Sequence, residues 1–138
     1  MRRIDFPFVE RFGEGGRLSQ WQALRARCFD GAVRAFLARH PGGTVVAIGE
    51  GLETQFWRVD DGRVHWLTVD LPDVVALRDE LLPPDPRRRA LAVSALDPSW
   101  SGEVDASAGV LLTAQGLLMY LEPDAVRGLV ERLSLIHI

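Results

Sequence analysis

The stretch VVAIGEGLETQFWR, residues 45–58, decides the fold because it joins a short apolar run to two closely spaced glycines. The run TVVAI, residues 44–48, is rich in β-branched residues and does not alternate with polar ones, which is typical of a parallel strand buried on both faces. Gly49 and Gly51 follow at its carboxyl end, where open α/β sheets bind ligands. Glycine there permits positive φ and a close backbone approach to a ligand, although Gly-x-Gly alone also fits a plain tight turn.

Strands and helices alternate along the rest of the chain. Apolar runs predict further strands over residues 64–69, 90–96 and 109–114, and amphipathic patterns predict helices from Pro72 and over residues 122–133. Residues 17–40 form a predicted N-terminal helical region, either one long helix or two helices joined near residues 30–31. We therefore expect an α/β fold with a doubly wound, mainly parallel sheet over residues 44–132.

Composition limits the classes of function. The chain has 138 residues, of which 47% are hydrophobic and 25% charged, and its net charge is −3. These values fit one soluble globular domain, and no apolar run is long enough to span a bilayer. The lone cysteine and the lack of an apolar signal segment at the N-terminus lead us to expect a cytoplasmic protein. The negative charge argues against nucleic acid as the main partner. The basic run at residues 87–89 is predicted to lie in a solvated loop.

Cysteine and histidine give no sign of a metal site. Cys28 is the one cysteine, and the three histidines share no metal-ligand spacing, so we assign no metal. We expect Cys28 to pack in the core from its helix rather than to act as a nucleophile, because no histidine is placed to activate it.

The two ends fit a complete domain poorly. Only one helix follows the predicted strand over residues 109–114, which would leave an apolar strand uncovered. We therefore expect a single partial domain, incomplete at the C-terminal side, with little or no turnover of its own and a tendency to self-associate through this edge. The closing LSLIHI, residues 133–138, abandons the amphipathic pattern and is predicted to be a non-native tail.

Two acids after the next strands indicate a ligand. Asp70 can accept hydrogen bonds from a ribose diol, or it can cap the helix that begins at Pro72. Asp97 can reach an adenine amino group, although an Asp-Pro turn explains it equally well. The third glycine of the dinucleotide fingerprint G-x-G-x-x-G is absent, since its place is taken by Thr54. Together these features suggest an adenosyl ligand without a pyrophosphate, S-adenosylmethionine.

A family resemblance becomes specific at these residues. The segments LRARCFDGAV, SALDPSW and TAQGLLMYL, with the glycine stretch between the first two, resemble in order and spacing the leucine carboxyl methyltransferase family. The chain is most similar to a branch of bacterial O-methyltransferases associated with polyketide biosynthesis. The resemblance runs from about residue 21 to residue 133 and reaches only the N-terminal part of the family's catalytic domain. It implies a class I, Rossmann-like, S-adenosylmethionine-dependent O-methyltransferase.

The resemblance also implies cofactor-binding roles for particular positions. Arg25 would pair with the methionine carboxylate of the cofactor, although a surface helix arginine is the alternative. Gly49 and Gly51 would form the cofactor loop. Asp70 would bind the ribose, and Asp97 would lie near the adenine.

Four positions depart from the usual pattern or have a second explanation. Gln115 stands where the family often has Glu, so the hydrogen-bonding shape is kept and the charge is lost. The usual loop reads G-L-D-T-R, whereas this chain has Glu53 and Gln55, a change that affects any loop salt bridge but not the glycines. Tyr120 would bind the substrate near the transferred methyl group, or else would pack in the core after the fourth strand.

The reaction class follows from what methyl transfer needs. Displacement at a sulfonium requires the nucleophile to be held in line with the methyl carbon. A carboxylate acceptor is already ionised at neutral pH and needs no base, and the sequence offers no convincing base. We therefore expect methylation of a carboxylate or acidic hydroxyl on a polyketide-like small-molecule acceptor, and we assign no catalytic residue. A NAD-dependent oxidoreductase and a noncatalytic binding module of the same fold are the alternatives.

Overall fold

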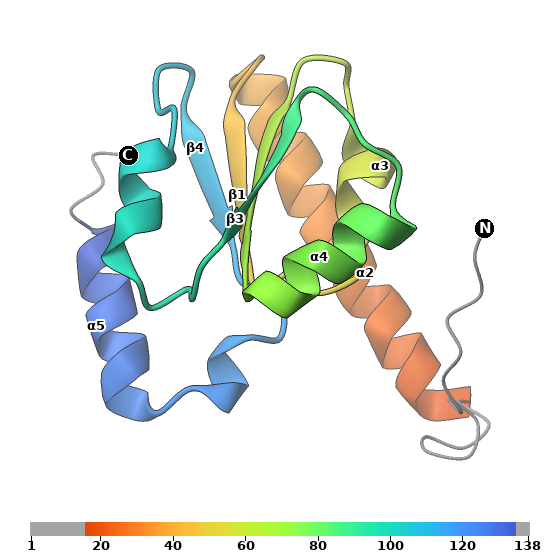
Figure 1. The fold of residues 1–138 in the computed structure, drawn as a ribbon. Helices are drawn as coiled ribbons and strands as arrows, with labels where there is room; N and C mark the ends of the chain where they lie inside the picture. The colour runs from red at the N-terminus through yellow and green to blue at the C-terminus, as the bar shows by residue number, and fades with distance from the viewer. Residues whose placement is uncertain (1–15, 135–138) are drawn as a thin grey trace.

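A four-stranded parallel sheet forms the centre of the molecule. The computed structural model describes the backbone of residues 16–134 and the side chains of residues 20–134. The strands lie in the order β3-β2-β1-β4, and every neighbouring pair is parallel (Figure 1). Their bounds are β1 Thr44–Ile48, β2 His65–Asp70, β3 Arg88–Ala92 and β4 Val110–Thr113. The expected doubly wound parallel sheet is confirmed.

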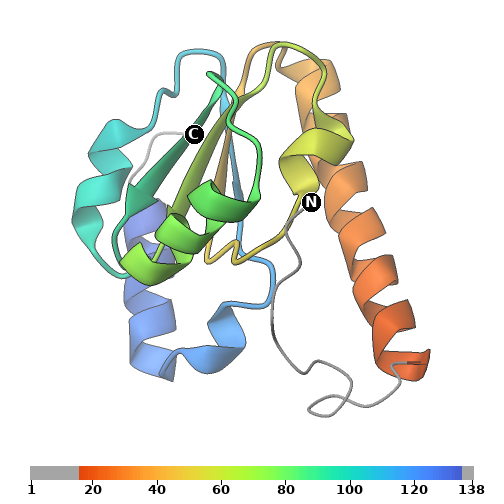
Figure 2. The same cartoon turned by 45° about the vertical axis from the view of Figure 1, so that its right-hand side comes forward.

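Helices cover both faces of this sheet. Figures 1 and 2 show α2, α3 and α4 on one face, and the 3-10 helix η1 with α5 on the other. Two separate buried clusters agree with this division, because one contains side chains of α2 and α3 and the other contains side chains of η1 and α5. The bounds are α2 Gly16–Arg39, α3 Gln55–Val59, α4 Pro72–Leu81, η1 Pro98–Glu103, η2 Leu118–Tyr120 and α5 Pro123–Leu133.

The first strand shows why its sequence lacks alternation. All five residues of β1 are buried. Val45 and Ala47 belong to the cluster under α2 and α3, whereas Val46 and Ile48 belong to the cluster under η1 and α5. Successive side chains of a strand point to opposite faces, so apolar residues at every position satisfy both layers at once.

Helix α2 is one continuous helix whose two halves have different surroundings. Val33 and Leu37 in its second half are buried against the sheet, but Trp21 is 71% exposed and Leu24 is 53% exposed. The first half extends past the sheet (Figure 2). Cys28 is exposed as well, so the prediction that it packs in the core is wrong. Helical periodicity identified a common face, but the sheet covers only part of that face.

Strand β3 begins two residues before its predicted start, which changes the surroundings of the arginine run. Arg88 belongs to β3, its side chain is 5% exposed, and its guanidinium lies 5.3 Å from the ring centre of Trp57. Arg87 forms an ion pair with Asp60. The prediction of a solvated loop is therefore wrong for Arg88, which is buried in the strand. Arg87 lies in the turn before β3 with its side chain 25% exposed, and Arg89 is a strand residue whose side chain is 61% exposed.

The sheet edge and the chain end complete the fold. Strand β4 lies at one edge of the sheet that the described residues form, and self-association through this edge stays a prediction. Leu133 is the last residue of α5, and residues 135–138 of the predicted tail lie outside the described residues. No helix within residues 16–134 has the length and hydropathy that a bilayer span requires.

Candidate functional site

The strand order reverses direction at β1, which has β2 on one side and β4 on the other. The crevice at the carboxyl end of such a strand is the usual ligand site of open α/β sheets. The turn after β1 lies there, and the N–H of Gly49 donates to the carbonyl of Val69 at 2.8 Å. Gly49 and Gly51 have φ of +61° and +57°. A Cβ on Gly49 would lie 2.9 Å from Leu117 Cδ1, whereas one on Gly51 would meet nothing within 4 Å.

Asp70 fastens this turn from the neighbouring strand. Its Oδ2 accepts from the N–H of Gly51 at 2.7 Å, and its Oδ1 accepts from the N–H of Leu71 at 2.8 Å. Leu71, not Asp70, is the N-cap residue of α4, so the capping alternative does not hold. Because each carboxylate oxygen can accept two hydrogen bonds, each oxygen of Asp70 keeps one free position. Gly49 and Asp70 thus lie at the same end of the sheet, the carboxyl end of its strands, as contact of both with one adenosyl ligand would require.

A buried ion pair supports the turn from the other side. Arg78 of α4 is fully buried, and its Nη2 lies 3.0 Å from Oε2 of Glu50. The Nη1 of the same guanidinium donates to the backbone carbonyls of Gly51 and Glu53, the latter at 3.0 Å. One side chain therefore fixes two carbonyls of the glycine turn and the acid between its glycines.

Glu50 is held by the sheet as well as by Arg78. Its Oε2 accepts from Thr68 Oγ1 at 2.7 Å and from Trp66 Nε1 at 3.3 Å. Burial raises the pKa of Glu50 above its ordinary value, and the attraction of Arg78 only partly opposes this. Neither Glu50 nor Arg78 was predicted from the sequence as a member of such a pair. A signal exists, because Arg78 follows the buried Val75 by three residues and so falls on the covered face of α4.

A second network joins the turn to α2. Arg58 Nε lies 2.9 Å from Oδ2 of Asp30, and Arg58 Nη1 lies 2.6 Å from Oε1 of Glu53. Gln55 donates to the other oxygen of Asp30 at 3.1 Å. A loop salt bridge is therefore present despite Gln55, because Arg58, one helical turn later, supplies the cation. Burial alone would raise the pKa of Asp30, but the hydrogen bonds and charge of Arg58 outweigh it and lower that pKa.

The variant Asp30→Asn tests this network. Asp30 has a folded pKa below its unfolded value, so its contribution to stability is complete above the unfolded pKa and is lost as the pH falls through the folded pKa. We expect the variant to be about 1–3 kcal/mol less stable than the unchanged chain at neutral pH, and the difference to shrink below about pH 4. Urea unfolding at several pH values measures this. A difference that is the same at every pH would contradict the ion-pair explanation.

Two cavities lie on either side of the glycine turn. The first, of about 310 Å³, is lined by polar side chains from three elements: Arg25 of α2, Glu53 of the turn and Gln115 after β4. The second, of about 130 Å³, has Asp70 and Leu117 in its wall, beside apolar residues after β3. Glu50 lines the first cavity and Gly49 the second, so the turn separates them.

Comparison with known proteins assigns the fold to a family. A family model described as leucine carboxyl methyltransferase matches residues 8–134. The chain belongs to this family. It is also 34% identical over 122 residues to the tetracenomycin polyketide synthesis O-methyltransferase TcmP of Streptomyces glaucescens, an alignment that covers 88% of this chain and 45% of that protein. The chain thus spans less than half the length of this relative, and the resemblance to the family that its sequence showed is confirmed.

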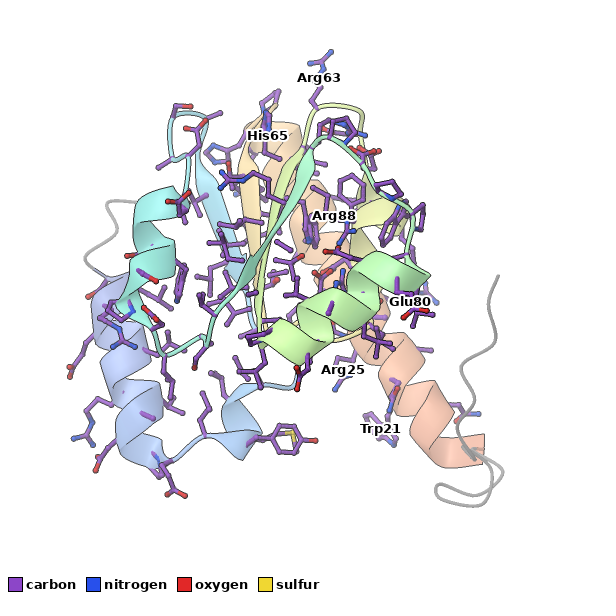
Figure 3. All side chains as sticks on the ribbon, viewed as in Figure 1. Trp21, Arg25, Arg63, His65, Glu80 and Arg88 are labelled. Carbon is purple, nitrogen blue, oxygen red and sulfur yellow. The ribbon has the colours of Figure 1, made fainter. Side chains whose placement is uncertain are left out.

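The site of this leucine carboxyl methyltransferase family member brings together most of the predicted residues. Arg25 and Gln115 line the first cavity, whereas Gly49 and Asp70 line the second. Figure 3 shows Arg25 and Trp21 beyond the lower end of the sheet, the carboxyl end, with His65 at the opposite end. Arg25 is exposed but is not remote from the site, because its Nη1 lies 3.1 Å from where a Cβ on residue 116 would be.

Gly51 belongs to the turn but lines neither cavity, and two further predicted residues, Asp97 and Tyr120, also lie outside both linings. Asp97 is exposed and accepts from the N–H of Ser99 at 2.9 Å, as the N-cap of η1. The turn alternative is therefore seen directly, and contact of Asp97 with adenine stays a prediction. Tyr120 is 79% exposed in η2, so the alternative that it packs in the core is wrong. Its role toward a substrate stays a prediction.

Proposed function

We propose that the chain is the cofactor-binding part of an S-adenosylmethionine-dependent O-methyltransferase. One observation carries this proposal: the glycine turn, fastened by Asp70, separates a polar cavity from a more apolar one at the switch point of the sheet. S-adenosylmethionine has the matching division, with a charged amino acid at one end and a nucleoside at the other. Family membership supports the same conclusion independently.

The reaction would depend on orientation more than on acid–base chemistry. The cofactor supplies a methyl group on a sulfonium. The residues of this chain would bind its two ends and hold the sulfonium at the turn, which Arg78 and Asp70 already keep in one shape. No histidine, lysine or tyrosine lines either cavity, as far as the described residues form them. This favours an acceptor that is already ionised, such as a carboxylate or an acidic hydroxyl.

The name of the relative suggests the class of acceptor. TcmP is described as an O-methyltransferase of tetracenomycin polyketide synthesis. We propose a polyketide-like small molecule for the present chain as well. This chain covers 45% of the length of that protein. We propose that on its own it would bind the cofactor with little turnover. This behaviour corresponds to the alternative of a noncatalytic binding module. The oxidoreductase alternative would require NAD to fit a turn with Thr54 in place of the third glycine.

Calorimetry with three ligands tests the proposal. We expect the chain to bind S-adenosylmethionine and S-adenosylhomocysteine with one ligand per molecule, and to give no heat with NAD. Binding of NAD alone would support the oxidoreductase instead. If no adenosyl ligand binds to a folded sample, as judged by circular dichroism, the proposed cofactor is wrong.

A further inference from the structure

The polar cavity carries two charged side chains of opposite sign that face the space from different elements. Arg25 reaches it from α2, and Glu53 reaches it from the turn after β1. Glu50 also lines it and its Oε1 has no hydrogen-bond partner among the described residues, but its side chain is 4% exposed, against 25% for Glu53, and it is paired with the buried Arg78. The cavity therefore offers one cation and one anion to a ligand.

The two oxygens of Glu53 are used unequally. Oε1 accepts from Arg58 Nη1 at 2.6 Å and from the N–H of Thr54 at 2.7 Å. Oε2 has one contact, the Nε2 of Gln115 at 3.4 Å, which is long for a hydrogen bond. Arg58 also serves Asp30, so one guanidinium is shared by two carboxylates. Negative charge on the Oε2 side of Glu53 is therefore left to interact with the cavity.

Gln115 adds a second unused acceptor beside the first. A carboxylate can only accept, so the amide nitrogen of Gln115 must face Glu53, and the amide oxygen must point elsewhere. That oxygen, Oε1, is buried and has no hydrogen-bond partner among the described residues. Buried polar atoms of this kind normally have a partner. A ligand with several N–H donors and a positive charge would satisfy both Glu53 and Gln115.

We propose that Glu53 is the anionic group that recognises the α-ammonium of the cofactor's methionine part, with Gln115 as its neutral partner. This inference rests on the proposed function. An ammonium has three donors, enough for Glu53 Oε2 and Gln115 Oε1 together. Arg25, in the same cavity, would hold the α-carboxylate. The carboxylate that the family often places at position 115 is thus supplied in this chain from position 53, across a contact between the two side chains.

Moving the charge across this contact tests the proposal. Calorimetry compares S-adenosylhomocysteine, which carries the amino acid, with 5′-methylthioadenosine, which lacks it. We expect Glu53→Gln to lower the affinity for S-adenosylhomocysteine by about tenfold or more. The affinity for 5′-methylthioadenosine should stay within about twofold of that of the unchanged chain. The double variant Glu53→Gln/Gln115→Glu returns the carboxylate from the opposite side and should regain most of the lost affinity. Glu103→Gln, which removes an exposed carboxylate paired with Arg89, is the matched control and should change neither ligand.

Three results would overturn the proposal: unchanged binding of S-adenosylhomocysteine by Glu53→Gln, equal weakening of both ligands, or no recovery in the double variant. Equal weakening would mean that Glu53 only maintains the turn. If the unchanged chain binds neither ligand, the proposed function fails instead, so the two failures are distinguishable. Should Glu53→Gln not fold, the double variant and Gln115→Leu, which removes the neutral partner alone, still decide the question. Gln115→Leu should lower the affinity for S-adenosylhomocysteine and leave the affinity for 5′-methylthioadenosine unchanged. A loss of affinity for 5′-methylthioadenosine alone would contradict the proposal.

Discussion

Replacing Arg78 by methionine should lower the free energy of unfolding by about 3–5 kcal/mol, the largest loss of stability that we expect from one substitution in this chain. The side chain of Arg78 is fully buried, and its partner Glu50 is 4% exposed. Methionine fills a similar space but leaves Glu50 as a buried charge without its ion-pair partner. It also removes the donors to the carbonyls of Gly51 and Glu53. Urea unfolding followed by circular dichroism measures the change.

The pH dependence of this loss identifies its cause. Burial already raises the pKa of Glu50, and removing Arg78 would raise it further, although Arg88 still attracts the carboxylate. A carboxyl group whose folded pKa exceeds its unfolded pKa destabilises the protein as the pH rises through that interval. The difference between Arg78→Met and the unchanged chain should therefore shrink as the pH falls from neutral toward the ordinary pKa of a glutamate, about 4.3.

Two further variants separate charge from volume. Glu50→Gln/Arg78→Met carries no buried charge at either position and should be more stable than Arg78→Met alone. Arg78→Lys keeps the charge but cannot reach Glu50 and two carbonyls at once, so its stability should be intermediate. A loss below about 1 kcal/mol for Arg78→Met, or no pH dependence, would contradict the role that we assign to the pair.

Asp70→Asn should lower the affinity for adenosyl ligands by about 10–100-fold, which is the largest effect on binding that we expect from one substitution. The carboxylate accepts from two backbone N–H groups and keeps positions for a ribose diol. An amide has one oxygen, so it loses both the charge and half of the acceptors. Since S-adenosylhomocysteine and 5′-methylthioadenosine share the ribose, we expect equal weakening of the two. This differs from Glu53→Gln, which should affect only the ligand with an amino acid.

Asp73→Asn is the matched control for Asp70→Asn. Asp73 is an exposed acid in the first turn of α4, close in sequence to Asp70 but outside both cavities. Its substitution changes the net charge equally and should leave both affinities unchanged. If folded Asp70→Asn binds both ligands as tightly as the unchanged chain, Asp70 does not contact the ribose.

The parts of the site that the sequence predicted are those fixed by strand order. Gly49 follows one buried apolar run and Asp70 ends the next. Neighbouring parallel strands have their carboxyl ends on the same side of the sheet, so the proximity of Gly49 and Asp70 could be predicted without knowledge of side-chain packing. Arg25 and Gln115 could be placed only through the family resemblance, because nothing local links a helix residue to a loop almost a hundred positions later.

Features that depend on packing between distant elements were not predicted. Arg88 can lie in a strand because its guanidinium packs over the ring of Trp57 in α3 and pairs with the carboxylate of Asp79 in α4. Local preference favours a loop for three consecutive arginines. The Glu50–Arg78 pair likewise joins a turn to the far end of the next helix but one. Helical periodicity could identify the apolar face of α2. It could not show that the sheet leaves this face uncovered at Cys28.

The exposed thiol of Cys28 has a practical consequence for measuring the oligomeric state. It is the one cysteine in the sequence, so air oxidation can join two molecules through a single covalent bridge. A dimer made in this way would have the same mass as one formed by pairing of β4 edges. Sedimentation in the presence of a reductant, or with Cys28→Ser, distinguishes the two, because only the non-covalent dimer then persists and dissociates on dilution.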